Sequence, residues 1–280
     1  MDLETFKKEF YKNGFVVVEN CISLELLDQA KQVFLEGLEE ITKKKCGLQE
    51  GMAEALRTYR LSDLQIFTHN KLQVQGIRKK LLLQPAVLEK FIHLIGPDLA
   101  YNRGGQISVN TKEQGDNLYR KRWHQEMWSG AGLNEVWIWI PLFMQQGLGG
   151  MEFIPGSHLW GIIPNRNREP TELPPSAQFV EAKIKEGDAV LFHPLTLHRT
   201  LPNPLEMPRV AFGSGVRNFN HRDTGIEPLL SWTPFHYSPY VRIRRALGNP
   251  YLTPFRTFGG QLTNADDGKK DLEGLDEFKI

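Results

Sequence analysis

The chain has 280 residues, of which 34 are Lys or Arg and 33 are Asp or Glu, so the formal net charge is +1. This balance argues against a surface built to bind nucleic acid. With 40% hydrophobic and 24% charged residues the composition is that of a folded globular protein, and two cysteines are too few for a disulfide scaffold. We therefore expect a cytoplasmic location. We expect no membrane span, because no run approaches about 18 consecutive apolar residues.

Residues 1–98 are expected to be mainly helical and to pack on the part of the chain that follows. A first helix is predicted to end at Asn13-Gly14, because glycine is the residue that most often follows the last turn of a helix. The β-branched run at residues 15–18 then predicts a short strand.

Further helices are expected before residue 98. Ser23 is a suitable N-cap for an amphipathic helix whose apolar positions reach Leu38. Residues 77–95 predict a pair of helices, with a break near Pro85. Residues 42–62 mix charged and apolar positions without a clear period, so no element is predicted there.

Beyond residue 98 the pattern changes to short apolar runs separated by Gly- and Pro-rich turns. This spacing predicts an antiparallel barrel or jelly roll over residues 99–220. Residues 161–177 are expected to be a long loop, and such loops are often functional. Residues 221–280 are expected to form a C-terminal segment that includes a candidate lid and a polar tail, within one single domain. The predicted strands are 105–110, 135–143, 151–154, 178–184, 188–193 and 208–216.

The triplet His124-Gln125-Glu126 is a candidate metal motif. On a strand alternate side chains share a face, so His124 and Glu126 converge while Gln125 points away. A third ligand would come from His193 or His198, and two His with one carboxylate suit an Fe(II) site that activates O₂. The alternative for His124 and Glu126 is that they are two surface polar residues. The alternative for His193 or His198 is a histidine that is hydrogen-bonded in the core or a loop.

Arg209 follows His198 by eleven residues and opens an apolar strand. A guanidinium buried inside a barrel is costly unless an anion pairs with it, and its planar fork matches a carboxylate. An arginine at the mouth of the barrel that faces solvent is the alternative.

The order H-x-E, His, Arg on a predicted barrel resembles the phytanoyl-CoA dioxygenase family of Fe(II)- and 2-oxoglutarate-dependent oxygenases. The likeness spans roughly residues 6–220. Trp123-His124-Gln125-Glu126 is similar to the W-H-Q-D signature of the family, and residues 154–158, which read Ile-Pro-Gly-Ser-His, are similar to its iPGSH turn. Residues 10–18 are similar to the opening segment of the family.

This resemblance implies a double-stranded β-helix, a cupin-like jelly roll that is mainly β with flanking helices. It implies that His124, Glu126 and His198 hold Fe(II), and that Arg209 binds the distal carboxylate of 2-oxoglutarate. Glu126 departs from the usual Asp of the family by one methylene. The presence of a carboxylate argues against halogenation, because the related halogenases have Gly or Ala here.

The resemblance also assigns further cavity residues. Thr200, Trp139 and Gln106 match positions that line the cosubstrate pocket. Independently of the resemblance, Trp128 follows the metal motif and is a candidate substrate contact, with packing in the barrel core as the alternative. The basic residues near the motif are more typical of a solvated surface run than of an anion site. These residues are Arg103, Arg120, Lys121 and Arg122.

The expected function is a dioxygenase that oxidises, by hydroxylation, an unactivated C–H bond of a small molecule. Its cofactors would be Fe(II), 2-oxoglutarate and O₂, with succinate and CO₂ as coproducts. Two alternatives stay open: an Fe(II) oxygenase that does not use 2-oxoglutarate, and a catalytically silent metal-binding member of the fold. No nucleic-acid or membrane partner is expected, and the sequence predicts neither the substrate nor the oligomeric state.

Overall fold

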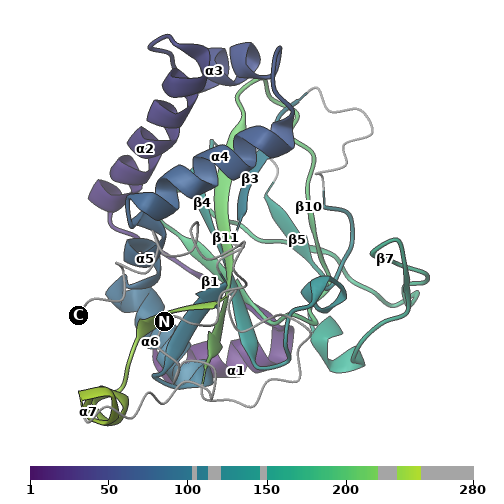
Figure 1. The fold of residues 1–280 in the computed structure, drawn as a ribbon. Helices are drawn as coiled ribbons and strands as arrows, with labels where there is room; N and C mark the ends of the chain where they lie inside the picture. Colours follow the sequence, from purple (N-terminus) through teal and green to yellow (C-terminus); the bar gives the residue numbers. More distant parts are fainter. Residues whose placement is uncertain (103–105, 113–120, 146–149, 220–231, 247–280) are drawn as a thin grey trace, which may run out of the picture. The chain divides into compact units, whose positions relative to one another are not determined.

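The computed structural model describes residues 1–102, 106–112, 121–145, 150–219 and 232–246 (Figure 1). The chain divides into two compact units, Met1–Phe235 and His236–Ile280. Much of the predicted lid and tail at residues 221–280 lies outside the described residues. The arrangement as one domain of three parts therefore stays a prediction.

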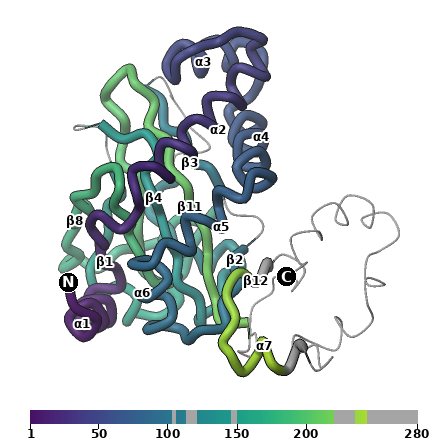
Figure 2. The backbone as a smooth tube through the Cα atoms, turned by 90° about the vertical axis from the view of Figure 1, so that its left-hand side faces the viewer, coloured from purple at the N-terminus to yellow at the C-terminus, as the bar shows by residue number. Residues whose placement is uncertain are grey.

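The N-terminal part is helical, as the sequence predicts. Helices α2, α4, α5 and α6 lie on one side of a large sheet, which the two views of the chain show (Figures 1 and 2). The predicted caps are present, because the Ser23 side chain accepts from the Leu26 N–H and Gly14 ends α1 with a φ of 81°. The helices are α1 (Leu3–Asn13), α2 (Leu24–Thr42), α3 (Leu48–Ala55), α4 (Leu61–Val74), α5 (Ile77–Leu82) and α6 (Pro85–Ile95).

The large sheet is antiparallel in every pair of strands whose register is known. Its strands follow the order β1-β9-β4-β11-β2-β12, and β3 also pairs with β11. The strands are β1 (Phe15–Val18), β2 (Leu99–Asn102), β3 (Gln106–Asn110), β4 (Glu135–Phe143), β9 (Ala189–Phe192), β11 (Arg209–Asn218) and β12 (Trp232–His236).

A smaller sheet faces the large one in the order β10-β5-β8. The predicted loop at residues 161–177 is not without structure, because it contains the two-stranded hairpin of β6 and β7. The remaining elements are β5 (Met151–Phe153), β6 (Asn165–Arg166), β7 (Glu169–Pro170), β8 (Val180–Glu181), β10 (His198–Thr200), the 3₁₀ helices η1 (Glu126–Ser129) and η2 (Ser157–Trp160), and, in the second unit, α7 (Pro239–Ala246).

The two faces of the large sheet have different roles. Alternate residues of β4 and β11, such as Ile138 and Phe212, join the core beneath the helices. The intervening residues, such as Trp137 and Trp139, pack with the smaller sheet, and the rings of Phe153 and Phe192 lie 5.6 Å apart across that layer. The fold is thus mainly β with flanking helices, and its inner layer is where a site can form.

No helix in the described ranges is long and apolar enough to span a bilayer.

Candidate active site

Two segments distant in sequence bring the predicted metal motif together. The backbones of His124 and His198 exchange both hydrogen bonds, with N···O distances of 3.0 and 3.1 Å. The Glu126 N–H donates to the Pro194 carbonyl at 2.9 Å. The expectation that His124 and Glu126 share a strand is wrong in detail, because His124 forms an isolated bridge and Glu126 begins η1. Gln125 nevertheless points away from both, as predicted, and its amide donates to the Leu195 carbonyl.

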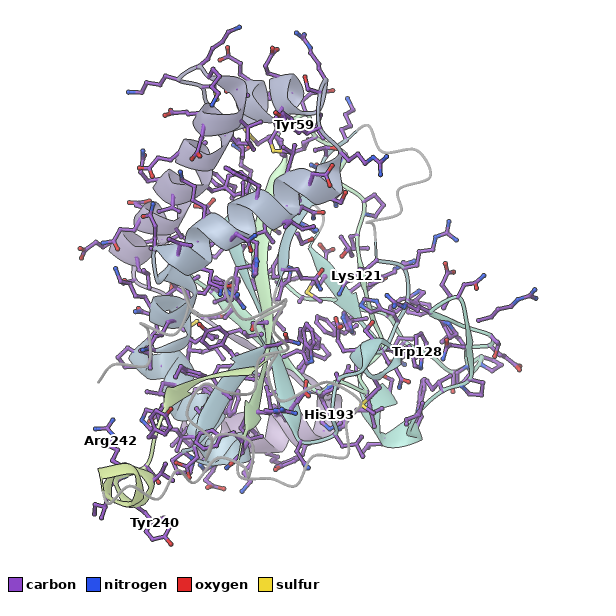
Figure 3. The ribbon with its side chains drawn as sticks, in the orientation of Figure 1. Tyr59, Lys121, Trp128, His193, Tyr240 and Arg242 are labelled. Carbon is purple, nitrogen blue, oxygen red and sulfur yellow. The ribbon has the colours of Figure 1, made fainter. Side chains whose placement is uncertain are left out.

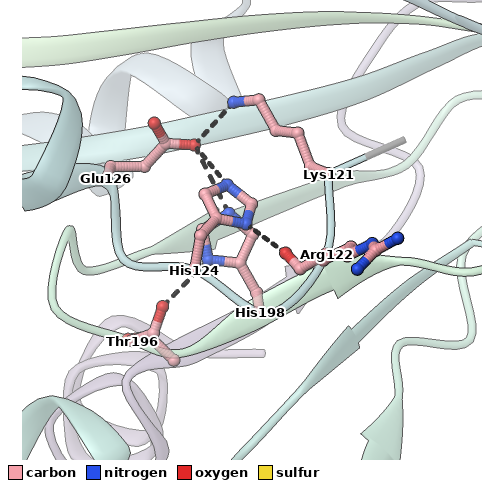
Figure 4. A network of polar contacts seen from close by, with 6 residues as sticks. All are labelled: Lys121, Arg122, His124, Glu126, Thr196 and His198. Carbon is pink, nitrogen blue, oxygen red and sulfur yellow. Dashed lines mark hydrogen bonds and ion pairs between the residues drawn. The ribbon is translucent and has the colours of Figure 1, made fainter. Parts of the chain in front are cut away.

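The side chains of His124, Glu126 and His198 converge on one point (Figure 4). Their ligand atoms lie within 4.8 Å of one another, and all three residues are buried. Glu126 Oε1 is 3.3 Å from His124 Nε2 and 3.4 Å from His198 Nε2. His193, the other histidine considered as a ligand, is not in this cluster, and its ring lies 5.7 Å from that of His158.

Backbone carbonyls orient both imidazoles. His124 Nδ1 lies 2.7 Å from the Arg122 carbonyl, and His198 Nδ1 lies 2.9 Å from the Thr196 carbonyl. A carbonyl only accepts, so each Nδ1 carries a hydrogen, and each Nε2 is the ring atom that faces the cluster. Burial lowers the pKa of His124 to about 4, which keeps this ring neutral near pH 7.

Glu126 supplies a negative charge to the same point. Burial by itself raises the pKa of this carboxyl, but the Lys121 ammonium, 3.1 Å from Oε1, contributes to holding it well below its usual range. Three lone pairs facing one another repel unless a cation lies between them. Bonds of about 2.1 Å to a first-row divalent ion put neighbouring ligand atoms about 3.0–3.5 Å apart. The two distances from Glu126 Oε1 to the imidazole nitrogens fall in this range. The residues present therefore fit a metal ion.

A cavity lies beside the cluster, and the three candidate ligands are part of its lining. Three residues predicted to line a cosubstrate pocket, Gln106, Trp139 and Thr200, are in its wall. Trp128 is not in that wall, and its indole N–H donates to the Ile163 carbonyl at 3.2 Å (Figure 3). Besides the three ligands, the described lining residues are Gln106, Ser108, Lys121, Trp137, Ile138, Trp139, Met151, Phe192, Thr200 and Gly213.

Arg209 lies next to Trp139, one of the residues that line this cavity. Its side chain is fully buried, which contradicts the alternative of an arginine facing solvent. One guanidinium nitrogen donates to the Gly150 carbonyl at 3.1 Å, and the guanidinium carbon lies 5.4 Å from the ring centroid of Trp139. Burial lowers the pKa of Arg209 to about 10, so the group stays a cation at neutral pH. This fixed positive charge suits a carboxylate.

Lys121 lines the cavity, although the sequence predicts that it belongs to a solvated surface run. Arg103 and Arg120, from the same basic group, lie outside the described residues. Arg122 fits the expected surface run, because its side chain is 67% exposed and pairs with Glu169. Lys121 instead turns toward Glu126 (Figure 4). Its position three residues before His124 is the one signal that could have marked it.

Sequence comparison gives a family match over most of the chain. The profile of the phytanoyl-CoA dioxygenase (PhyH) family matches residues 10–211. The phytanoyl-CoA dioxygenase domain-containing protein 1 of Danio rerio is 29% identical over 192 residues. That alignment covers 64% of this chain and 60% of the relative, so it spans less than two thirds of the relative's length.

Solved structures share the fold at low identity. A non-heme monooxygenase, ThoJ in its apo form, is 21% identical with a TM-score of 0.59, over 82% of this chain and 83% of the other. The epimerase SnoN, in complex with Fe3+, alpha ketoglutarate and nogalamycin RO, is 16% identical with a TM-score of 0.58, over 83% and 94%. EctD from S. alaskensis, with 2-oxoglutarate and 5-hydroxyectoine, is 15% identical with a TM-score of 0.55, over 80% and 78%.

Proposed function

Because the chain belongs to the phytanoyl-CoA dioxygenase family, we propose that it is an Fe(II)- and 2-oxoglutarate-dependent dioxygenase that oxidises a small molecule. The observation that carries this proposal is the convergence of His124, Glu126 and His198 beside a cavity backed by the buried cation Arg209. Two imidazoles and one carboxylate leave coordination positions open for other ligands. This is the ligand set of enzymes that activate O₂.

Each residue has a distinct role in the proposed reaction. His124, Glu126 and His198 would hold the iron, which with 2-oxoglutarate supplies oxidation by O₂ and yields succinate and CO₂. Arg209 would bind the distal carboxylate of 2-oxoglutarate through charge-assisted hydrogen bonds. Trp139, which lines the cavity and whose ring centroid lies 5.4 Å from the Arg209 guanidinium carbon, would hold the cosubstrate against one wall. The apolar side chains of Met151 and Phe192 would exclude water from the rest of the cavity.

We propose hydroxylation of an unactivated C–H bond as the outcome of the reaction. The solved neighbours include a monooxygenase and an epimerase, so this fold supports more than one outcome. The cavity beside the metal cluster, lined by aromatic and apolar side chains with a few polar groups, supports a small-molecule substrate. The cytoplasmic location stays a prediction from the composition.

Succinate formation tests the proposal. The purified protein, given Fe(II), 2-oxoglutarate and air, is expected to release succinate slowly even without substrate, and to release none without O₂. His198→Ala is expected to lower this rate at least about 100-fold, because loss of a ligand exceeds the 10- to 100-fold cost of losing a supporting partner. His193→Ala is the matched control and should retain the rate. Equal rates in the two variants, or succinate formed without O₂, would contradict the proposal.

A further inference from the structure

Lys121 occupies a position between the metal cluster and the cavity. Its Nζ lies 3.1 Å from Glu126 Oε1, the same oxygen that faces both imidazoles (Figure 4). Nζ also lies 5.8 Å from the ring centroid of Trp137, and the Lys121 side chain is 36% exposed. The Thr200 N–H donates to the Lys121 carbonyl at 2.9 Å, which fixes the backbone at this point. The ammonium is thus held at the cavity but can still change partner.

Nearby cations are paired with carboxylates away from the cavity. Arg122 pairs with Glu169 at 3.2 Å, and Arg199 pairs with Glu152 at 2.6 Å. Of the described residues that line the cavity, Lys121 is the one with a positive charge. Among the described lining residues, Lys121 is therefore the cation that can pair with an anion in the open part of the cavity.

Metal binding would change what Lys121 pairs with. The free carboxylate of Glu126 attracts the ammonium, as this structure shows. A divalent ion bound to the same oxygen would take over that charge and repel the ammonium, because like charges a few ångströms apart repel strongly in a buried site. Lys121 would then need another anion.

If the proposed function holds, the site loaded with metal and 2-oxoglutarate contains one positive charge without a counter-charge. A divalent ion, Glu126, the two carboxylates of 2-oxoglutarate and Arg209 sum to +2 − 1 − 2 + 1 = 0. Lys121 adds one positive charge that no other described residue of the cavity lining, and neither carboxylate of the cosubstrate, balances. The cosubstrate already has a partner for each carboxylate, the metal for one and Arg209 for the other.

We propose that Lys121 is a specificity-determining residue that leaves Glu126 on metal loading and binds a carboxylate of the substrate. The substrate class is thus a small organic acid with one negative charge beside the carbon to be oxidised. Matched neutral molecules, such as the primary amide of the same acid, lack the charge that Lys121 would pair with and should bind more weakly.

The test uses the full chain loaded with Co(II) and the inert cosubstrate analogue N-oxalylglycine. Monocarboxylates from acetate to benzoate, and their primary amides, are titrated while the visible Co(II) spectrum is recorded. At least one acid is expected to bind 10-fold or more tightly than its amide. The preference should vanish in Lys121→Met, persist in Lys121→Arg, and be unchanged in Lys183→Met, which removes an exposed lysine. No acid preference, or one that survives Lys121→Met, would overturn the proposal.

Two further measurements separate this proposal from its alternatives. Lys121→Met should bind Co(II) at least 10-fold more tightly than the wild type, since the ammonium no longer competes for Glu126, and unchanged affinity would count against the exchange of partners. The Kd of 2-oxoglutarate should stay within about 3-fold; a 10-fold loss would assign Lys121 to the cosubstrate and overturn the proposal. Failure of the wild type to bind Co(II) at all would refute the proposed function instead.

Discussion

Glu126 Oε1 is the atom at which the charges of the site meet. Two imidazole nitrogens and one ammonium lie between 3.1 and 3.4 Å from it. The tautomers of His124 and His198 follow from their Nδ1 partners, so the cluster is prepared for a cation before one binds. Glutamate in place of the more usual aspartate reaches this point from the first residue of η1.

Arg209 gives a prediction at the residue scale. Arg209→Met keeps much of the side-chain volume and removes the charge. The Kd of 2-oxoglutarate is expected to rise roughly 100-fold, because about 3 kcal/mol of charge-assisted hydrogen bonding is lost. Isothermal titration of the Co(II)-loaded protein measures this Kd. Co(II) affinity, measured in the same variant, should be unchanged and shows that the site is folded; an unchanged Kd for 2-oxoglutarate would refute the role of Arg209.

Residue types and spacing made His124 and Glu126 candidate ligands, because metal chemistry restricts the side chains that can serve. They left the third ligand open between His193 and His198, and the family resemblance selected His198. The same reasoning placed Lys121 in a solvated run, since its neighbours in sequence are also basic. Side-chain direction decides between the two, and direction depends on the backbone pairing of Lys121 with Thr200. That pairing joins positions 79 residues apart in the numbering and has no local signature.

At the scale of elements, the turn between α1 and β1 supports the metal site. The Gly14 carbonyl accepts from the Thr196 hydroxyl at 2.8 Å and from the His193 N–H at 2.8 Å. The Thr196 carbonyl in turn orients His198. Gly14 has a φ of 81°, and a Cβ there would lie 2.4 Å from Thr196 Oγ1 and 2.5 Å from His158 Nδ1.

Gly14→Ala is therefore expected to be costly for both fold and site. The left-handed backbone costs about 1 kcal/mol for alanine, and displacement of Thr196 and His158 adds about 1–3 kcal/mol. Urea unfolding measures the loss, and Co(II) affinity should fall at least 3-fold. Gly76→Ala is the control, because Gly76 has a φ of 68° but no atom within 4 Å of the added Cβ. Equal losses in the two variants would contradict the account.

Local signals predicted most elements, but not all of them. Ser23 marked the start of α2 as its N-cap, and Gly14 marked the end of α1 as its C-cap, because capping is a local interaction. Helix α3 begins at a glycine N-cap without a side-chain cap, and α4 follows an arginine N-cap, so residues 42–62 lack start signals. Tertiary packing of Leu48, Met52 and Leu64 stabilises these helices instead.

At the scale of the whole molecule, buried histidines make stability depend on pH. His69 in α4 is 7% exposed, and burial, together with the nearby Arg78, lowers its pKa from 6.5 to about 4. The unfolded chain binds the proton near pH 6.5 and the folded chain only near pH 4, so stability falls as the pH drops through this window. At pH 5 the loss attributable to His69 is about 2 kcal/mol.

The variant His69→Leu isolates this contribution. In metal-free protein, the free energy of unfolding of the wild type is expected to fall between pH 7.5 and pH 5. In His69→Leu that fall should be smaller by about 2 kcal/mol, because the proton acceptor of the unfolded state is gone. Urea titrations at the two pH values give the comparison. The same pH dependence in both proteins would show that His69 is not a buried neutral group.

The measurement that tests the central claim most directly is an anaerobic titration of the metal-free protein with Fe(II) and then 2-oxoglutarate. The visible charge-transfer band of an iron-bound 2-oxoglutarate chelate is followed throughout. The account predicts a band that needs both components, disappears in His198→Ala and persists in His193→Ala. Iron binding without any band on addition of 2-oxoglutarate would contradict it, and would favour an oxygenase that does not use 2-oxoglutarate or a silent metal-binding protein.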